Sequence, residues 1–165
     1  MTEINIANSD SDYSIIKKLA NTIWREYYIP ILGLMQVEYM LNKYHTVSTI
    51  TNRVEQGYKY FVITYEQTPV GFISFKKEKD SLFLSKIYVL KDYRGRKIGK
   101  TAMQFIYDKA KSMNCNKVVL TVNKHNSSSI NAYEKLGFNN IGEIVIDIGN
   151  GFVMDDYKME KRIEN

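Results

Sequence analysis

The stretch that decides the fold spans residues 87–100 and reads Ile87-Tyr88-Val89-Leu90-Lys91-Asp92-Tyr93-Arg94-Gly95-Arg96-Lys97-Ile98-Gly99-Lys100. Its aliphatic and aromatic start predicts the end of a β-strand, and its last residues open an amphipathic helix. From Arg94 to Lys100 the loop and the helix start carry two glycines and four basic side chains. The first N–H groups of a helix have no partner within the helix, and the helix dipole adds positive charge there. The junction therefore predicts a site where a diphosphate approaches the backbone.

The spacing of this loop matches neither of the two common nucleotide-binding patterns. It is not G-x-x-x-x-G-K-[ST], and it is not G-x-G-x-x-G. From these residues alone an alternative stays open, in which Gly95 and Gly99 serve only a tight turn and the four basic side chains are solvated.

The chain on either side of the loop predicts an α/β protein with a mixed, mostly antiparallel sheet. The expected elements are a strand at 4–6, a helix carrying the apolar series 15–27, helices near 37–41 and 47–56, strands at 58–65, 70–75 and 82–89, a helix at 98–113, a strand at 117–122, a helix at 127–136, and strands near 141–148 and 152–160. Pro30 and Gly33 are expected to break the first helix. The expected order is β-α-α-β-β-β-α-β-α-β-β, with helices on both faces of the sheet. No linker, repeat or low-complexity tract divides residues 1–165, so we expect a single domain.

The loop resembles the acetyl-CoA loop of the N-acetyltransferases of the GNAT superfamily. Their pattern is Arg/Gln-x-x-Gly-x-Gly/Ala, and it follows a strand that ends in an aliphatic-x-Val step. Arg94, Ile98 and Gly99 fit this pattern, whereas Lys97 stands where glycine is usual. The resemblance implies a GNAT fold in which acetyl-CoA is the co-substrate. The implied contacts are Ile87, Tyr88 and Val89 for the pantetheine, and Arg94, Gly95, Arg96, Lys97, Ile98, Gly99 and Lys100 for the diphosphate.

A second motif lies about one strand further along the chain and reads Asn126-Ser127-Ser128-Ser129-Ile130-Asn131-Ala132-Tyr133-Glu134-Lys135-Leu136-Gly137-Phe138. It resembles the GNAT pattern Asn-x-x-Ala-x-x-x-Tyr-x-Lys-x-Gly-Phe, with Ser129 in place of the alanine. The resemblance implies that Asn126 binds the pantetheine arm and that Tyr133 protonates the departing thiolate. Each residue also has a structural interpretation: Asn126 as a helix N-cap, Tyr133 as core, and Gly137-Phe138 as a helix C-terminus. The order of the two motifs favours the functional interpretation.

Composition excludes several other classes of protein. The 44% hydrophobic and 25% charged residues are globular values, and the net charge of +5 favours an anionic partner without requiring nucleic acid. Cys115 is the single cysteine, and His45 and His125 are isolated, so we expect no disulfide and no metal. No apolar run reaches the ~18 residues of a membrane span. We therefore expect a cytoplasmic protein with neither a nucleic-acid nor a membrane partner.

The resemblance implies direct acetyl transfer to a primary amine, without a nucleophilic side chain. The acceptor is a small amine, a polyamine, a protein N-terminus or a lysine. An alternative is a catalytically inactive regulator that binds CoA or a nucleotide, which need not keep Tyr133. We also expect a homodimer, from family habit and aromatic content.

The acceptor site is expected to be walled by the segments 24–44 and 147–159. These segments resemble those of bacterial polyamine (spermidine/spermine-type) N-acetyltransferases, and Asp147, Asp155 and Asp156 are expected to attract a cationic amine. The general base stays open among Glu26, Glu38, Glu143 and Asp147.

Overall fold

The structure is a computed structural model that describes residues 1–164. Its elements are β1 (Thr2–Ile6), α1 (Asp10–Leu32), α2 (Leu34–Tyr44), α3 (Val47–Glu55), β2 (Lys59–Tyr65), β3 (Thr68–Glu78), β4 (Ser81–Val89), the 3-10 helix η1 (Lys91–Tyr93), α4 (Ile98–Ser112), β5 (Lys117–Asn123), α5 (Ser127–Lys135), β6 (Asn139–Gly149) and β7 (Phe152–Arg162). Within these residues, seven strands hydrogen-bond in the order β1-β2-β3-β4-β5-β7-β6. The β4–β5 pair is parallel, and β1–β2, β2–β3, β5–β7 and β6–β7 are antiparallel. The predicted mixed α/β fold is confirmed.

Three α-helices lie between β1 and β2 in the part of the chain described, at the three ranges that the sequence predicts, although the expected order counted only two of them. The first of them continues through Pro30 to Leu32, so the expectation that Pro30 breaks it is wrong. Proline removes one backbone N–H bond, but Pro30 lies in the last turn, where the helix ends two residues later. Gly33 does end the helix as expected, with φ of 85° and its N–H donating to the Ile29 carbonyl at 2.9 Å.

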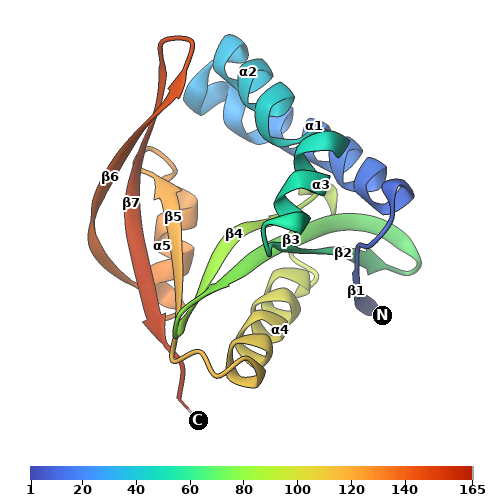
Figure 1. The fold of residues 1–165 in the computed structure, drawn as a ribbon, viewed down its shortest axis with the longest axis vertical. Coiled ribbons are helices and arrows are strands. Elements are labelled where there is room, and N and C mark those ends of the chain that lie inside the picture. The colour runs from blue at the N-terminus through green and yellow to red at the C-terminus, as the bar shows by residue number, and fades with distance from the viewer. Residues whose placement is uncertain (165) are drawn as a thin grey trace. The chain divides into compact units, whose positions relative to one another are not determined.

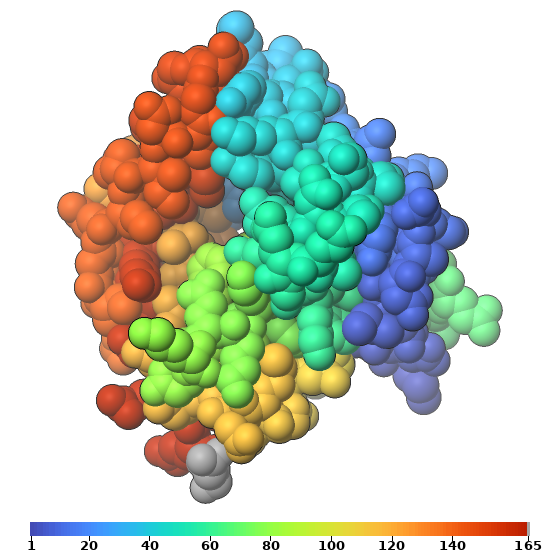
Figure 2. Space-filling view, viewed as in Figure 1, coloured from blue at the N-terminus to red at the C-terminus, as the bar shows by residue number. Residues whose placement is uncertain are grey.

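The chain packs as two compact units, and unit 1 comprises residues 1–76 and 84–108. In this unit α1–α3 lie on one face of β2 and β3, and α4 lies on the other (Figure 1). Alternate strand residues point to opposite faces. Accordingly, the ring centroid of Phe61 lies 5.0 Å from that of Phe105 of α4, whereas the ring centroid of Phe72 lies 6.3 Å from that of His45 on the α1–α3 side. Side chains of α2 and α3, cyan to teal in Figure 2, form a closely packed surface over this unit.

Unit 2 comprises residues 77–83 and residues from 109 onward. Strand β5 is its centre: it pairs in parallel with Ser81–Phe83 of β4 and antiparallel with β7. Strands β7 and β6 form a long hairpin (Figure 1). The apolar run expected to be covered on both faces is buried at Val118, Val119 and Leu120.

Candidate active site

The loop between β4 and α4 has a left-handed backbone at two positions. These are Gly95, with φ of 81°, and Lys97, with φ of 62°. Lys97 therefore adopts a conformation that suits glycine, the residue usual there in the family pattern, at a cost of about 1–2 kcal/mol. A Cβ atom added at Gly95 or Gly99 would meet nothing within 4 Å. The backbone of the loop is thus open to a close-approaching ligand.

The start of α4 supplies amide donors beside these glycines. The N–H of Thr101 bonds to the Lys97 carbonyl at 3.1 Å. The N–H groups of Ile98, Gly99 and Lys100 come before this first turn is closed, so they have no carbonyl partner within the helix. Together with the positive end of the helix dipole they can bind an anion. The expected diphosphate contacts are therefore brought together in unit 1.

The two arginines of the loop lie against tyrosine rings. The Arg94 guanidinium is 5.2 Å from the ring centroid of Tyr27, and that of Arg96 lies 5.4 Å from Tyr65 and 5.2 Å from Tyr93. Such cation–π contacts hold a cation in place. Both arginines remain exposed, so these contacts orient the two side chains and leave the alternative of solvated basic side chains open.

The end of β4, where the pantetheine is expected, is held tightly by β3. A Cβ atom at Gly71 would collide with the Tyr88 carbonyl oxygen, and the Leu90 N–H donates to the Val70 carbonyl at 2.8 Å. The Tyr88 ring lies 6.1 Å from Trp24 of α1. The segment 24–44, expected to wall the acceptor site, thus reaches the end of β4.

In unit 2 the second motif forms a capped helix. The Asn126 side chain is buried and accepts from the Ser129 N–H at 3.3 Å, which confirms its interpretation as an N-cap. At the other end Gly137 has φ of 98°, its N–H donates to Glu134, and the Phe138 N–H donates to the Tyr133 carbonyl, each at 3.0 Å. This is the Schellman motif.

The same motif fixes the ring of Tyr133. Phe138 packs against it with ring centroids 5.5 Å apart, which is the apolar contact that accompanies a Schellman motif. Tyr133 is half-buried, so it is not an ordinary core residue. Its position on the capped helix α5 is therefore fixed at the backbone and at the ring.

The four carboxylates considered as general bases are all exposed. Glu38 pairs with Arg25 at 2.9 Å, and Asp147 accepts the Gly149 N–H at 2.8 Å. These groups have the surroundings of ordinary surface carboxylates.

Asp156 on β7 is different, because it is 4% exposed. Burial raises the pKa of its carboxyl to about 6, the charge of Asp155 adds to the rise, and a hydrogen bond with Thr121 opposes it. Asp155 itself pairs with Lys124 at 2.8 Å. Of the aspartates expected to attract an amine, Asp156 is therefore the one with the properties of a base. It lies on β7 opposite Asn123 of β5, a long-range pairing that no local sequence pattern reveals.

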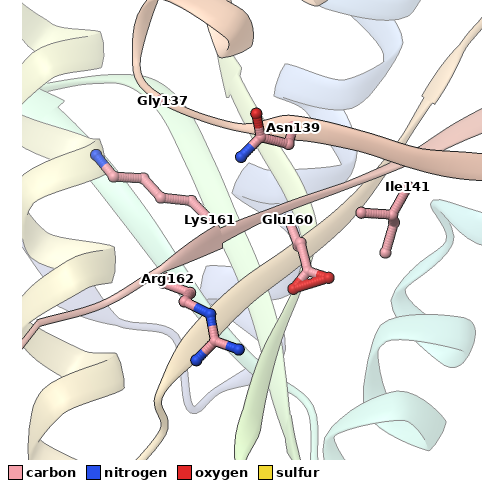
Figure 3. Close-up of a pocket in the computed structure, with 6 residues that line it drawn as sticks. All are labelled: Gly137, Asn139, Ile141, Glu160, Lys161 and Arg162. Carbon is pink, nitrogen blue, oxygen red and sulfur yellow. The ribbon is translucent and has the colours of Figure 1, made fainter.

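A further pocket of about 470 Å³ lies in unit 2 (Figure 3). Its lining residues are Gly137, Asn139, Ile141, Glu160, Lys161 and Arg162. Glu160 and Arg162 extend to the same side of β7, as residues two apart in a strand do. The Lys161 ammonium donates to the Leu136 carbonyl at 2.6 Å at the end of α5. None of the site residues predicted from the sequence lines this pocket, and we assign it no part in the reaction.

The chain belongs to the acetyltransferase (GNAT) family, whose sequence model matches residues 17–138. It is 29% identical over 132 residues to N-alpha-acetyltransferase 30 of Dictyostelium discoideum, a match that covers 69% of this chain and 68% of that protein.

Two solved structures show the same fold. One is the PaiA N-acetyltransferase from Thermoplasma acidophilum in complex with coenzyme A (TM-score 0.81, 22% identity, 98% of this chain and 99% of that one). The other is the ribosomal-protein-S18-alanine N-acetyltransferase from Escherichia coli (TM-score 0.74, 17% identity, 100% and 96%).

Family membership confirms the resemblance noted in the sequence: the protein is an acyltransferase of the N-acetyltransferase class. A non-catalytic regulator is not favoured by these likenesses, which are to acetyltransferases. Residues 1–164 contain no cluster of side chains fit to hold a metal ion. Across the same residues, no helix has both the length and the apolarity that crossing a membrane requires.

Proposed function

We propose that the protein transfers the acetyl group of acetyl-CoA directly to the α-amino group of a small molecule or peptide. The observation that carries the proposal is the open loop at the start of α4, in a chain of the acetyltransferase family. Relatives named as an N-alpha-acetyltransferase and as an alanine N-acetyltransferase support an α-amine as acceptor. The bound thioester supplies an activated acetyl group, and side chains of this protein supply the rest.

In this proposal the loop and the end of β4 hold the co-substrate. The amides of Ile98, Gly99 and Lys100 bind the diphosphate, and nearby basic side chains add charge. The backbone of residues 87–89 takes the pantetheine as an added strand. Support comes from the parallel register of β4 with β5, which within residues 1–164 ends at Phe83 and leaves residues 87–89 outside it.

The acceptor amine must lose a proton before it attacks. An α-amine has a pKa of about 7.7–8.0, so much of it is protonated near neutral pH. Asp156 is ionised there, since burial places the pKa of its carboxyl at about 6. We assign Asp156 as the general base, acting directly or through one water.

Tyr133 donates a proton to the departing thiolate, a role its hydroxyl suits because a tyrosine and a thiol differ little in pKa. Direct transfer needs no nucleophilic side chain. Cys115 supports this, because it is buried and burial raises the pKa of its thiol, which makes it a poor nucleophile.

The test is thiol release from acetyl-CoA with a panel of amines, with the acetylated product identified by mass spectrometry. We expect α-amines to be acetylated and Tyr133→Phe to lower kcat by about 10²-fold with unchanged acetyl-CoA affinity. The matched control is Tyr157→Phe, also half-buried in unit 2. An unchanged kcat in Tyr133→Phe, with chemistry rate-limiting, removes this tyrosine from the mechanism. If none of the amines in the panel causes thiol release, the proposed reaction is contradicted.

We also propose a homodimer in a reducing, cytoplasmic compartment. Exposed apolar side chains on the β6–β7 hairpin support a second copy as the partner: Ile141, Val145, Ile146 and Val153. The lone buried thiol supports the compartment. Sedimentation that shows only a 19.3 kDa species at tens of micromolar contradicts the dimer.

A further inference from the structure

Unit 1 contains a buried group of nitrogen donors that the proposed reaction does not use. Lys86 on β4 is 9% exposed, His45 at the end of α2 is 2% exposed, and Trp24 on α1 is 5% exposed. Lys86 lies two residues from Tyr88 and so shares its face of β4, the face on which Tyr88 contacts Trp24.

The donors lie among aromatic rings at the end of β4. The His45 ring is 5.1 Å from Trp24 and 6.3 Å from Phe72, and Phe72 is 5.4 Å from Tyr88. The group therefore lies among aromatic rings, and its Lys86 directly precedes residues 87–89 in the chain.

Two of the polar atoms in this group have no hydrogen-bond partner within residues 1–164, and the third has a weak one. His45 Nδ1 and Trp24 Nε1 are buried without a hydrogen-bond partner. The Lys86 ammonium donates to the Ser85 hydroxyl at 3.4 Å, which is long for a hydrogen bond. Buried polar groups are normally satisfied, and a buried charge is normally paired.

The charges that act on this group are all positive. Burial lowers the pKa of Lys86 to about 7, and the charge of Arg53 on α3 adds to the effect. Burial lowers the pKa of His45 well below its usual range, and the charges of Lys86 and Arg53 contribute. Arg53 also lowers the pKa of Tyr60 on β2, although burial raises it overall. An anionic group placed here would be attracted by two cations and accept from unpaired donors.

We infer that Trp24, His45 and Lys86 bind a carboxylate of the acetyl acceptor, so that the acceptor is an amino acid or a short peptide with a free carboxylate. The inference rests on the proposed function and names its substrate class. The aromatic setting favours a carboxylate over a phosphate dianion, which is costlier to remove from water. The positive charges of Lys86 and Arg53 disfavour a polyamine, because they would repel its ammonium groups. The resemblance to polyamine acetyltransferases is therefore not carried into this proposal.

A direct consequence is proton uptake at Lys86. An opposite charge nearby favours the charged form of an amine, so a bound carboxylate raises the pKa of Lys86 from about 7. Above that pH the complex then takes up a proton, and affinity for the carboxylate falls as pH rises further. His45 stays neutral in this range, because burial and the nearby positive charges lower its pKa well below its usual value.

The first experiment measures this site without acetyl transfer. The protein carries ¹³Cε-labelled lysine, the Lys86 signal is assigned by its loss in Lys86→Met, and the probes are N-acetylglycine and N-acetylglycinamide. We expect N-acetylglycine to raise the pKa of Lys86 by about one unit or more and the amide to leave it unchanged. Lys86→Met weakens N-acetylglycine binding about tenfold or more, while Lys59→Met, at an exposed lysine of β2, does not. No shift with N-acetylglycine overturns the inference.

The second experiment measures the acceptor preference. We expect kcat/KM for alanine or a dipeptide to exceed that for the corresponding amide by about tenfold or more. Lys86→Met abolishes this preference by lowering kcat/KM for the acid; Lys86→Gln serves if Lys86→Met does not fold. Equal use of acid and amide, or preference for spermidine, overturns the inference while acetyl transfer stands. A pKa shift at Lys86 without turnover of any amine leaves the carboxylate site in place and overturns the proposed reaction.

Discussion

Lys97→Gly is expected to make the protein more stable and a weaker binder of acetyl-CoA. Lys97 has φ of 62°, a left-handed conformation that costs about 1–2 kcal/mol for a residue with a side chain. Glycine removes that cost but gains about 0.4–1 kcal/mol of unfolded-state entropy. The net gain in the free energy of unfolding is about 0.5–1 kcal/mol, which raises the Tm by about 1–4 °C for a chain of this size.

The binding effect has the opposite sign, because the substitution removes one exposed charge beside the expected diphosphate. An exposed ion pair contributes about 0.2–1 kcal/mol, so the Kd for acetyl-CoA rises about 1.5- to 5-fold. Calorimetry of unfolding and of acetyl-CoA binding measures the two effects. The control is Lys100→Gly in α4, where glycine is unfavourable by about 1 kcal/mol and the Tm falls. A fall in Tm for Lys97→Gly that equals the fall in the control refutes the argument from backbone strain.

Three further substitutions test separate parts of the account. Asp156→Asn lowers kcat/KM by about 10²-fold or more. The wild-type kcat/KM falls as pH drops through about 6, and a wild-type pH profile that is flat there argues against Asp156 as the base. Because the pKa of Asp156 is raised in the folded state, its ionisation lowers stability as pH rises through about 6, so the same variant has a higher Tm near pH 8 than the wild type. Gly137→Ala, at φ of 98°, lowers the free energy of unfolding by about 1 kcal/mol in denaturant titration, and no change contradicts the Schellman assignment. Gly71→Ala is more severe, with a loss of about 2 kcal/mol or more, because its Cβ meets the Tyr88 carbonyl; a Tm equal to that of the wild type contradicts this close approach.

Features encoded in a short stretch of sequence could be predicted. The strand-loop-helix junction and the capped helix after Asn126 depend on glycines, caps and local periodicity, and both occur where the sequence places them. The passage of α1 through Pro30 was not predicted, because a proline in the last turn removes only one hydrogen bond close to the end that Gly33 sets.

The buried ionisable groups depend on long-range pairing instead. Asp156 is buried on β7 opposite Asn123 of β5, and no neighbouring residue in the sequence indicates that register. The burial of Lys86 could have been predicted from the sequence. It alternates in step with Leu82 and Leu84, which are both buried on β4, so its side chain lies on the same covered face. A lysine in that register indicates a site rather than a surface.

In the proposed reaction the open start of α4 holds the diphosphate of acetyl-CoA. The most direct test of this proposal is calorimetric titration of acetyl-CoA into the wild type and Gly99→Val, with Gln104→Val at an exposed position of α4 as the control. A Cβ at Gly99 enters open space, so the valine should not disturb packing but should occupy the volume that the diphosphate needs. We expect the Kd for acetyl-CoA to rise about tenfold or more, about 1.4 kcal/mol, in Gly99→Val alone. Wild-type affinity in Gly99→Val would contradict it.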